Sequence, residues 1–205
     1  MKVGLDASLN LLRHAKARCR GDLLVCGEVE HLPFKSGVFG TVISCRVIQH
    51  IREQERAVQE MARVVRTGGD VIIEFYNALN PKSIYKWIRM NRWLRSLLNA
   101  PFRLLFKSMS PFAEWGLDYD HYNYWLEVKR WMRRAGLRDI NGRGTGFGYH
   151  KYFWSPFYVD AVLAKRAPNL RERYYDACLT VDRAVGGWVP FRYAMEKIVL
   201  KGTKD

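Results

Sequence analysis

The stretch from Gly27 to Gly69 decides the fold of this 205-residue chain. It contains Gly27-Glu28-Val29-Glu30-His31-Leu32-Pro33-Phe34, then Phe39-Gly40-Thr41-Val42-Ile43-Ser44, and finally Glu60-Met61-Ala62-Arg63-Val64-Val65-Arg66-Thr67-Gly68-Gly69. The apolar run Thr41–Val47 predicts a strand buried on both faces of a parallel sheet. Apolar residues at helical spacing predict a helix over Glu53–Arg66, which Thr67-Gly68-Gly69 is expected to end, because glycine accepts the left-handed cap. Asp70–Tyr76 predicts the next strand, so the stretch forms a βαβ unit.

The residues before this stretch extend the same alternation. Lys2–Leu5 predicts a strand that ends at Asp6, Ser8 is the expected N-cap of a helix, and Leu23–Cys26 predicts the next strand. The helix between these strands carries Leu9, Leu11, Leu12, Ala15 and Ala17 and is expected to end near Gly21. A chain of this length makes one domain with an ordinary core. The pattern predicts an α/β, doubly wound fold.

These motifs carry a resemblance to a known family. Its members read Gly-Asp-Ala-Glu-x-Leu-Pro-Phe, then Phe-Asp-x-Val, and then Glu-x-x-Arg-Val-Leu-x-Pro-Gly-Gly. From residue 2 to about residue 76 the chain resembles the class I S-adenosylmethionine-dependent methyltransferases of the "methyltransferase 11" type. The resemblance returns faintly near Ala135-Gly136-Leu137. Three positions depart from the pattern: Glu28 and Gly40 each replace an Asp, and Thr67 replaces a Pro.

The resemblance implies a mostly parallel, Rossmann-like sheet and S-adenosylmethionine as the cofactor. The family has a central strand and a Gly-x-Gly-x-Gly turn before the strand that ends at Asp6, and this sequence has neither. Strands 2–6 and 41–47 therefore cannot pair as they do in the family. We expect a fragment or late start of a longer protein, or else a sheet that closes differently around a damaged site; the first is favoured. In both cases this chain alone is expected to bind the cofactor poorly.

Candidate cofactor-binding residues follow the predicted strands, because ligands of parallel sheets bind beyond the carboxyl ends of the strands. In the family, an acid at the position of Asp6 accepts hydrogen bonds from the ribose diol. An acid at the position of Glu28 meets the adenine amino group, and the N–H of the next residue, Val29, meets the ring. The alternative for Asp6 is a turn or helix-capping aspartate. The full candidate set is Asp6, Ala7, Glu28, Val29, Cys45 and Arg46.

A second glycine-rich run, Gly142–Gly148, offers another cofactor loop, as a permuted methyltransferase would have. The preceding run Leu137–Ile140 is short and polar, and no clear helix follows the glycines. These features favour a flexible loop near the mouth of the substrate site.

Two helical insertions are predicted within the single domain, a lid over residues 79–122 and a C-terminal insertion over residues 156–190. Lys82–Phe106 predicts an amphipathic helix that ends at Pro101. It either covers the substrate or lies on an anionic membrane surface, or it is an ordinary helix with a solvated basic face. Between the insertions, a helix is expected over Tyr124–Ala135, capped by Asn123. The last elements expected are helical pieces at Val159–Lys165 and Leu170–Val185 and a strand at Ile198–Leu200.

Methyl transfer from an activated sulfonium needs the acceptor to be positioned in line, and a general base when the acceptor is a hydroxyl or an acidic carbon. The candidate catalytic residues are His121 with Tyr119, and His50, which matches a histidine common in the family. A hydrogen-bonded structural histidine is the alternative for both. The aromatic residues of the 79–122 lid suit a small-molecule or lipid-like acceptor. We expect that lid to lie against Ser44, Cys45 and Arg46.

The net charge of +14 favours anionic partners, among them nucleic acid, acidic lipid and phosphorylated substrates. An RNA methyltransferase is therefore one alternative, and a non-catalytic module that binds an anionic membrane surface or a partner is another. The four cysteines show no metal-ligand spacing, and Cys26 and Cys45 are expected to be reduced core residues. Reduced thiols and the absence of an apolar signal or span predict a cytoplasmic protein, with the membrane periphery open. The identity of the acceptor and the oligomeric state cannot be predicted from the sequence.

Overall fold

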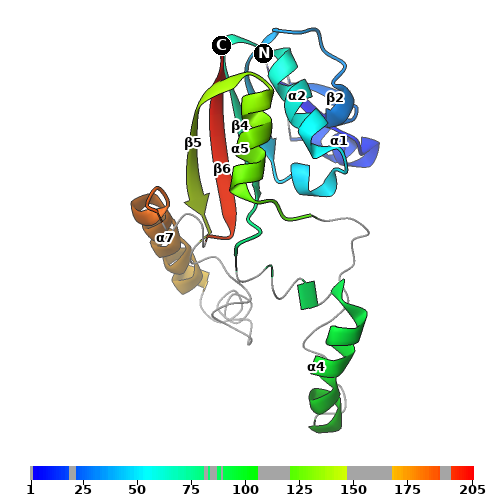
Figure 1. Cartoon of the computed structure of the whole chain (residues 1–205), viewed down its shortest axis with the longest axis vertical. Helices are drawn as coiled ribbons and strands as arrows, with labels where there is room; N and C mark the ends of the chain where they lie inside the picture. Colours follow the sequence, from blue (N-terminus) through cyan, green and yellow to red (C-terminus); the bar gives the residue numbers. More distant parts are fainter. Residues whose placement is uncertain are drawn as a thin grey trace. The chain divides into compact units, whose positions relative to one another are not determined.

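The computed structural model describes residues 2–18, 22–80, 83, 87–88, 90–105, 121–146, 168–189 and 195–205 (Figure 1). These residues divide into two compact units. Unit 1 comprises residues 1–74, 126–141 and 200–205, and unit 2 comprises residues 75–125 and 142–199. The helices and strands give the α/β fold that the sequence predicts.

Unit 1 begins with a strand, a helix and a strand. β1 (Val3–Asp6) and β2 (Leu23–Cys26) pair in parallel, and α1 (Leu9–Lys16) connects them. The predicted cap is confirmed, because the Ser8 side chain accepts a hydrogen bond from the Leu11 N–H. Of the apolar residues on α1, only Leu12 is buried, whereas Leu9 and Leu11 are more than half exposed.

The second sheet has four strands in the order β3-β4-β6-β5. β3 (Phe39–Cys45) and β4 (Val65–Tyr76) are parallel, and α2 (Gln54–Val64) joins them. The predicted apolar face of α2 is confirmed, because Ala57, Val58, Met61 and Val64 are all at most 1% exposed. Figure 1 shows β4, β6 (Lys197–Lys204) and β5 (Leu137–Thr145) side by side, with α5 (Trp125–Arg134) against them.

The predicted glycine stop of α2 is wrong. The helix ends at Val64, and Val65 is already extended, with φ −78° and ψ 140°. Gly68, with φ +72°, lies instead within β4, where the pairing with β3 shifts between Phe39 and Thr41. Gly69 is needed at this irregularity because a Cβ there would lie 2.7 Å from the carbonyl oxygen of Gly40. The glycines therefore form a bulge in the strand.

Among the described strands, β1 and β3 each lie at the edge of a sheet and do not pair with each other, in agreement with the expectation that they cannot pair as they do in the family. A cavity of about 170 Å³ is lined by Val3 and Leu5 of β1 and by Thr41–Ser44 of β3. The prediction that β3 is buried on both faces is wrong. The Ile43 side chain is 68% exposed, since no described residue covers this side of the strand, while Ser44 faces inward at 6%.

The structure corrects four predictions for unit 2: the end of a helix at Pro101, the cap at Asn123, and both interpretations of the glycine-rich run. α4 (Arg92–Leu105) begins after Asn91, whose side chain accepts from the Leu94 N–H, and it continues through Pro101. Proline costs a helix one N–H donor, and here the helix continues for one further turn. The Asn123 side chain does not cap α5, because its Oδ1 accepts no hydrogen bond from the described residues. The backbone of Asn123 instead forms an isolated parallel β-bridge with Asn77.

The remaining two corrections concern the glycine-rich run. Residues 142–145 belong to β5, so neither a cofactor loop nor a flexible loop describes them. At the end of β5, the Gly146 N–H donates to Asp182 of α7 (Pro168–Val185) at 2.7 Å. The expected helical piece at Val159–Lys165 and Tyr119 lie outside the described residues.

Candidate active site

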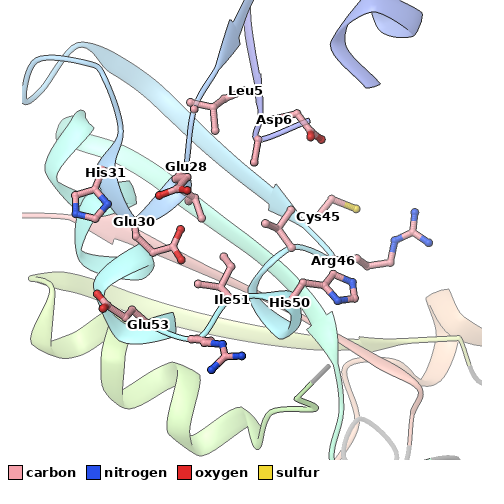
Figure 2. Close-up of a pocket in the computed structure, with 15 residues that line it drawn as sticks. Leu5, Asp6, Glu28, Glu30, His31, Cys45, Arg46, His50, Ile51 and Glu53 are labelled. Atoms are coloured by element: carbon pink, nitrogen blue, oxygen red, sulfur yellow. The ribbon is translucent and has the colours of Figure 1, made fainter. Parts of the chain in front are cut away.

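A cavity of about 690 Å³ lies where β1, β2 and β3 end (Figure 2). All three strands contribute the residues at their carboxyl ends, which is where parallel sheets bind ligands. The lining residues are Leu5, Asp6, Ala7, Gly27, Glu28, Val29, Glu30, His31, Cys45, Arg46, Val47, His50, Ile51, Arg52 and Glu53. All of them belong to unit 1.

Asp6 both shapes the first turn and lines the cavity. Its Oδ1 accepts a hydrogen bond from the Ser8 N–H at 2.8 Å, which fixes the turn into α1. The turn role and the ligand role considered for this aspartate are thus compatible, because a carboxylate has a second oxygen and about four lone-pair sites. Ala7 follows at the cavity wall, and its carbonyl oxygen lies 3.5 Å from the Cys26 thiol.

Glu28 and Val29 lie at the start of a short 3-10 helix, η1 (Val29–His31). Glu28 is exposed and makes no side-chain cap to this helix. The chain after η1 is held to α2 by an ion pair: the Leu32 N–H donates to Glu60 Oε2 at 2.9 Å, and the Arg63 guanidinium donates to the carbonyl oxygens of Leu32 and Phe34. These contacts fix the direction in which the chain leaves the cavity.

After the residues that follow β1 and β2, the turn after β3 forms the third part of the cavity wall. Arg46 has φ +56°, a backbone conformation that costs a non-glycine residue free energy and therefore needs support. Its N–H donates to the carbonyl oxygen of Glu74 at 2.9 Å, and its guanidinium lies 3.6 Å from the Glu74 carboxylate. A second 3-10 helix, η2 (Ile48–His50), follows and places His50 at the cavity.

The charges of the cavity are mixed. Asp6, Glu28, Glu30 and Glu53 supply carboxylates, and Arg46 and Arg52 supply guanidinium groups. Such a lining suits a ligand that carries positive and negative groups together with hydroxyls. Among the described residues, no cluster of three or more His, Cys, Asp or Glu side chains could hold a metal ion.

The structure brings seven of the nine candidate residues to this one cavity: Asp6, Ala7, Glu28, Val29, Cys45, Arg46 and His50. His121 lies in unit 2, next to Tyr122, whose ring stacks on that of Tyr76 with centroids 5.1 Å apart. Cys26 and Cys45 are free but exposed, so the prediction of core cysteines is wrong. Their strands end at the cavity, where no described residue covers them.

Sequence reasoning missed several lining residues, namely Glu30, His31, Ile51, Arg52 and Glu53. They lie on or beside the short 3-10 helices, which have too few residues to show a periodic pattern. The signal that could have found them is their position in the sequence, because all five follow closely after strands that end at the cavity.

Comparison with known proteins agrees with this geometry. A family model described as a methyltransferase domain matches residues 2–73, the part of the chain that holds the cavity. An Encephalitozoon cuniculi protein named as a methyltransferase is 39% identical over 90 residues, which cover 42% of each chain. The crystal structure of an S-adenosylmethionine-dependent methyltransferase from Thermotoga maritima covers 100% of this chain and 73% of its own, with a TM-score of 0.58 and 18% identity.

Residues 2–73 thus carry the sequence pattern of the methyltransferase domain family, and the fold is that of the S-adenosylmethionine-dependent methyltransferases. Demethylmenaquinone methyltransferase of Paenarthrobacter aurescens is 28% identical to this chain over 157 residues, which cover 71% of this chain and 57% of that enzyme. The chain spans less than half the length of the Encephalitozoon relative. No described helix of this chain has both the length and the apolar character that crossing a membrane requires.

The residues at the cavity fit S-adenosylmethionine, the cofactor of the family. Asp6 keeps one carboxylate oxygen beyond the one that Ser8 uses, and a ribose diol can donate to it. Glu28 is exposed at the cavity and can accept from an amino group. The volume of about 690 Å³ lies within the range of small-molecule pockets.

Proposed function

We propose that this protein transfers the methyl group of S-adenosylmethionine to an apolar, ring-bearing small molecule. The observation that carries the proposal is the convergence of Asp6, Glu28 and the turn at Arg46 on one cavity. In this assignment Asp6 binds the ribose, and Glu28 with the Val29 N–H binds the adenine. Ala7, Cys45 and Arg46 form the remaining cofactor-facing wall.

The cofactor supplies an already activated methyl group. The protein's own residues therefore have to orient the acceptor and exclude water, since proximity and alignment supply most of the rate. Where the acceptor is a hydroxyl or an acidic carbon, His121 with Tyr119 accepts its proton. The 79–122 insertion, rich in aromatic residues, covers the acceptor in this proposal.

The acceptor class is supported by the extent of one similarity. The alignment with demethylmenaquinone methyltransferase covers 71% of this chain, about twice the segment that the family model matches. It therefore includes residues beyond those that bind the cofactor. An apolar ring also suits the aromatic side chains of the insertion. A nucleic-acid acceptor is the second candidate, because the net charge is +14.

The cofactor assignment can be tested by titrating S-adenosylhomocysteine into ¹⁵N-labelled protein and following backbone amide shifts, which also report weak binding. We expect Asp6, Val29 and Arg46 to shift. Asp6→Asn and Glu28→Gln should each weaken binding by about 1–3 kcal/mol, the cost of a lost charge-assisted hydrogen bond. Asp22→Asn is the matched control, because Asp22 is exposed and does not line the cavity. Equal affinity in all four proteins would refute the assignment.

The acceptor is tested by supplying tritiated S-adenosylmethionine with either a demethylated quinol or transfer RNA. Label in the quinol supports the proposal, and label only in RNA replaces it with the second candidate. In the active protein, His121→Ala and Tyr119→Phe should lower turnover while cofactor affinity stays unchanged. Turnover that survives both substitutions would remove their catalytic role.

A further inference from the structure

The turn after β3 contains a glutamine that is buried completely. Gln49 is 0% exposed, between Arg46 and His50, which both line the cavity. Its Nε2 lies 2.7 Å from the carbonyl oxygen of Arg46 and 3.1 Å from Nε2 of His50. Figure 2 shows Arg46 and His50 next to each other on this turn. Gln49 itself does not line the cavity, so it acts on a ligand only through its two neighbours.

The contact with Arg46 fixes which end of the amide faces the turn. A carbonyl oxygen only accepts hydrogen bonds, so the atom 2.7 Å from it has to be the amide nitrogen. That NH₂ group has two hydrogens. One points to the Arg46 carbonyl oxygen, and the other is available to Nε2 of His50 at 3.1 Å.

The same contact decides the tautomer of His50. A ring nitrogen that receives an N–H carries no proton of its own, so Nε2 is the acceptor and the proton of the neutral ring is on Nδ1. A proton on Nε2 would face the amide hydrogens and lose this hydrogen bond. The ring nitrogen that could act as a base is then already engaged by Gln49.

We propose that Gln49 is a positioning residue that holds His50 in the Nδ1–H tautomer and supports the left-handed backbone of Arg46. His50 Nε2 is then engaged by Gln49 and is no general base in the resting state. One amide group has both effects, because one of its hydrogens points to the Arg46 carbonyl oxygen and the other to the His50 ring. The tautomer is a property of the cavity before any ligand binds, and it can be measured whether or not methyl transfer takes place.

The test is long-range ¹H–¹⁵N correlation of the histidine rings, recorded at about pH 8. The His50 signals are identified by their loss in His50→Asn. We expect the wild type to show an unprotonated Nε2 and a protonated Nδ1. Gln49→Glu replaces the donor with an acceptor, so the proton should move to Nε2. Gln49→Leu removes the donor, and the fixed Nδ1–H pattern should be lost.

Gln54→Leu is the matched control. Gln54 is also a buried glutamine, and its Nε2 donates to the carbonyl oxygen of Ile48 at 2.9 Å in the same turn. A merely structural role predicts that both leucine variants lower the melting temperature and leave the His50 pattern unchanged. That result, or a wild-type ring protonated at Nε2, would overturn the proposal. The wild-type spectrum alone is decisive if a variant fails to fold.

A second readout separates this proposal from the proposed function. If S-adenosylhomocysteine binds the wild type, Gln49→Leu should weaken that binding more than Gln54→Leu does. If the wild type binds no cofactor, the proposed function fails, and the tautomer measurement still decides the role of Gln49.

Discussion

The Arg63 Nε donates to Glu60 Oε1 across 2.7 Å, and the same two side chains hold the segment between β2 and β3 to α2. Glu60 accepts from the Leu32 N–H, while Arg63 donates to the carbonyl oxygens of Leu32 and Phe34. A short Glu-x-x-Arg sequence on one helix thus positions a loop that begins at the cavity.

The first prediction is that Arg63→Met destabilises the protein by about 1–3 kcal/mol, because two carbonyl oxygens and a carboxylate lose a charged donor. Urea unfolding followed by circular dichroism measures the loss. The control is Arg134→Met, which removes an ion pair with Glu55 in which the arginine side chain is 59% exposed. That substitution should change stability by less than about 1 kcal/mol. Equal effects would mean that Arg63 is no more than a surface charge.

The second prediction concerns pH. The hydrogen bond from Arg63 lowers the pKa of Glu60 below its ordinary value of 4.5. A depressed folded-state pKa stabilises the protein above the unfolded-state value, and this contribution is lost as the pH falls through the folded-state pKa. Wild type should therefore lose stability below about pH 4.5, and Glu60→Gln should remove part of that dependence. An identical pH profile for the variant, from pH 7 to pH 3 or so, would contradict the assignment.

The third prediction compares two adjacent glycines in the β4 bulge. Gly68→Ala should cost about 1–2 kcal/mol, because the backbone is left-handed but a Cβ would meet nothing within 4 Å. Gly69→Ala should cost more, because its Cβ would lie 2.7 Å from the Gly40 oxygen and 2.9 Å from the Arg66 oxygen. Thermal unfolding of both variants gives the order. The reverse order would show that the bulge relaxes easily.

The fourth prediction concerns amide exchange along β3. The Arg46 N–H bonds to Glu74 of β4, so the alternation of a strand points the N–H groups of Val42 and Ser44 toward β4 and those of Ile43 and Cys45 to the unpaired edge. Hydrogen exchange followed by NMR should show fast exchange at Ile43 and Cys45 and slow exchange at Val42 and Ser44. Uniform protection along β3 would mean that another strand occupies its edge.

The sequence predicts the elements whose signals are local. The α2 face, the cap at Ser8 and the strand β2 follow from side-chain spacing or from one side-chain bond, and the structure has all three. The glycines at 68 and 69 were misplaced because a left-handed glycine serves a helix cap and a strand bulge equally well. Only the pairing with β3 decides between these two roles, and pairing is not a local property.

The site residues also divide into those that could be predicted from the sequence and those that could not. Asp6, Glu28 and Arg46 could be predicted because each follows an apolar strand, and the chemistry of strand ends is general. The partnership of Gln49 with His50 could not, because it depends on burial and on an amide orientation that the Arg46 carbonyl oxygen sets. The exposure of Ile43 could not be predicted either, since an apolar residue in a strand pattern is expected to be covered.

In the part of the chain that the structure describes, β1 and β3 have open edges, and these edges affect how the protein has to be handled in solution. An unpaired edge presents backbone donors and acceptors that another molecule can bind, and the 68% exposed side chain of Ile43 adds apolar surface beside them. Charge repulsion at +14 opposes self-association at low ionic strength, and added salt screens it. Preparations of this chain should therefore stay dispersed in dilute, low-salt buffer and form sheet-linked aggregates as salt and protein concentration rise.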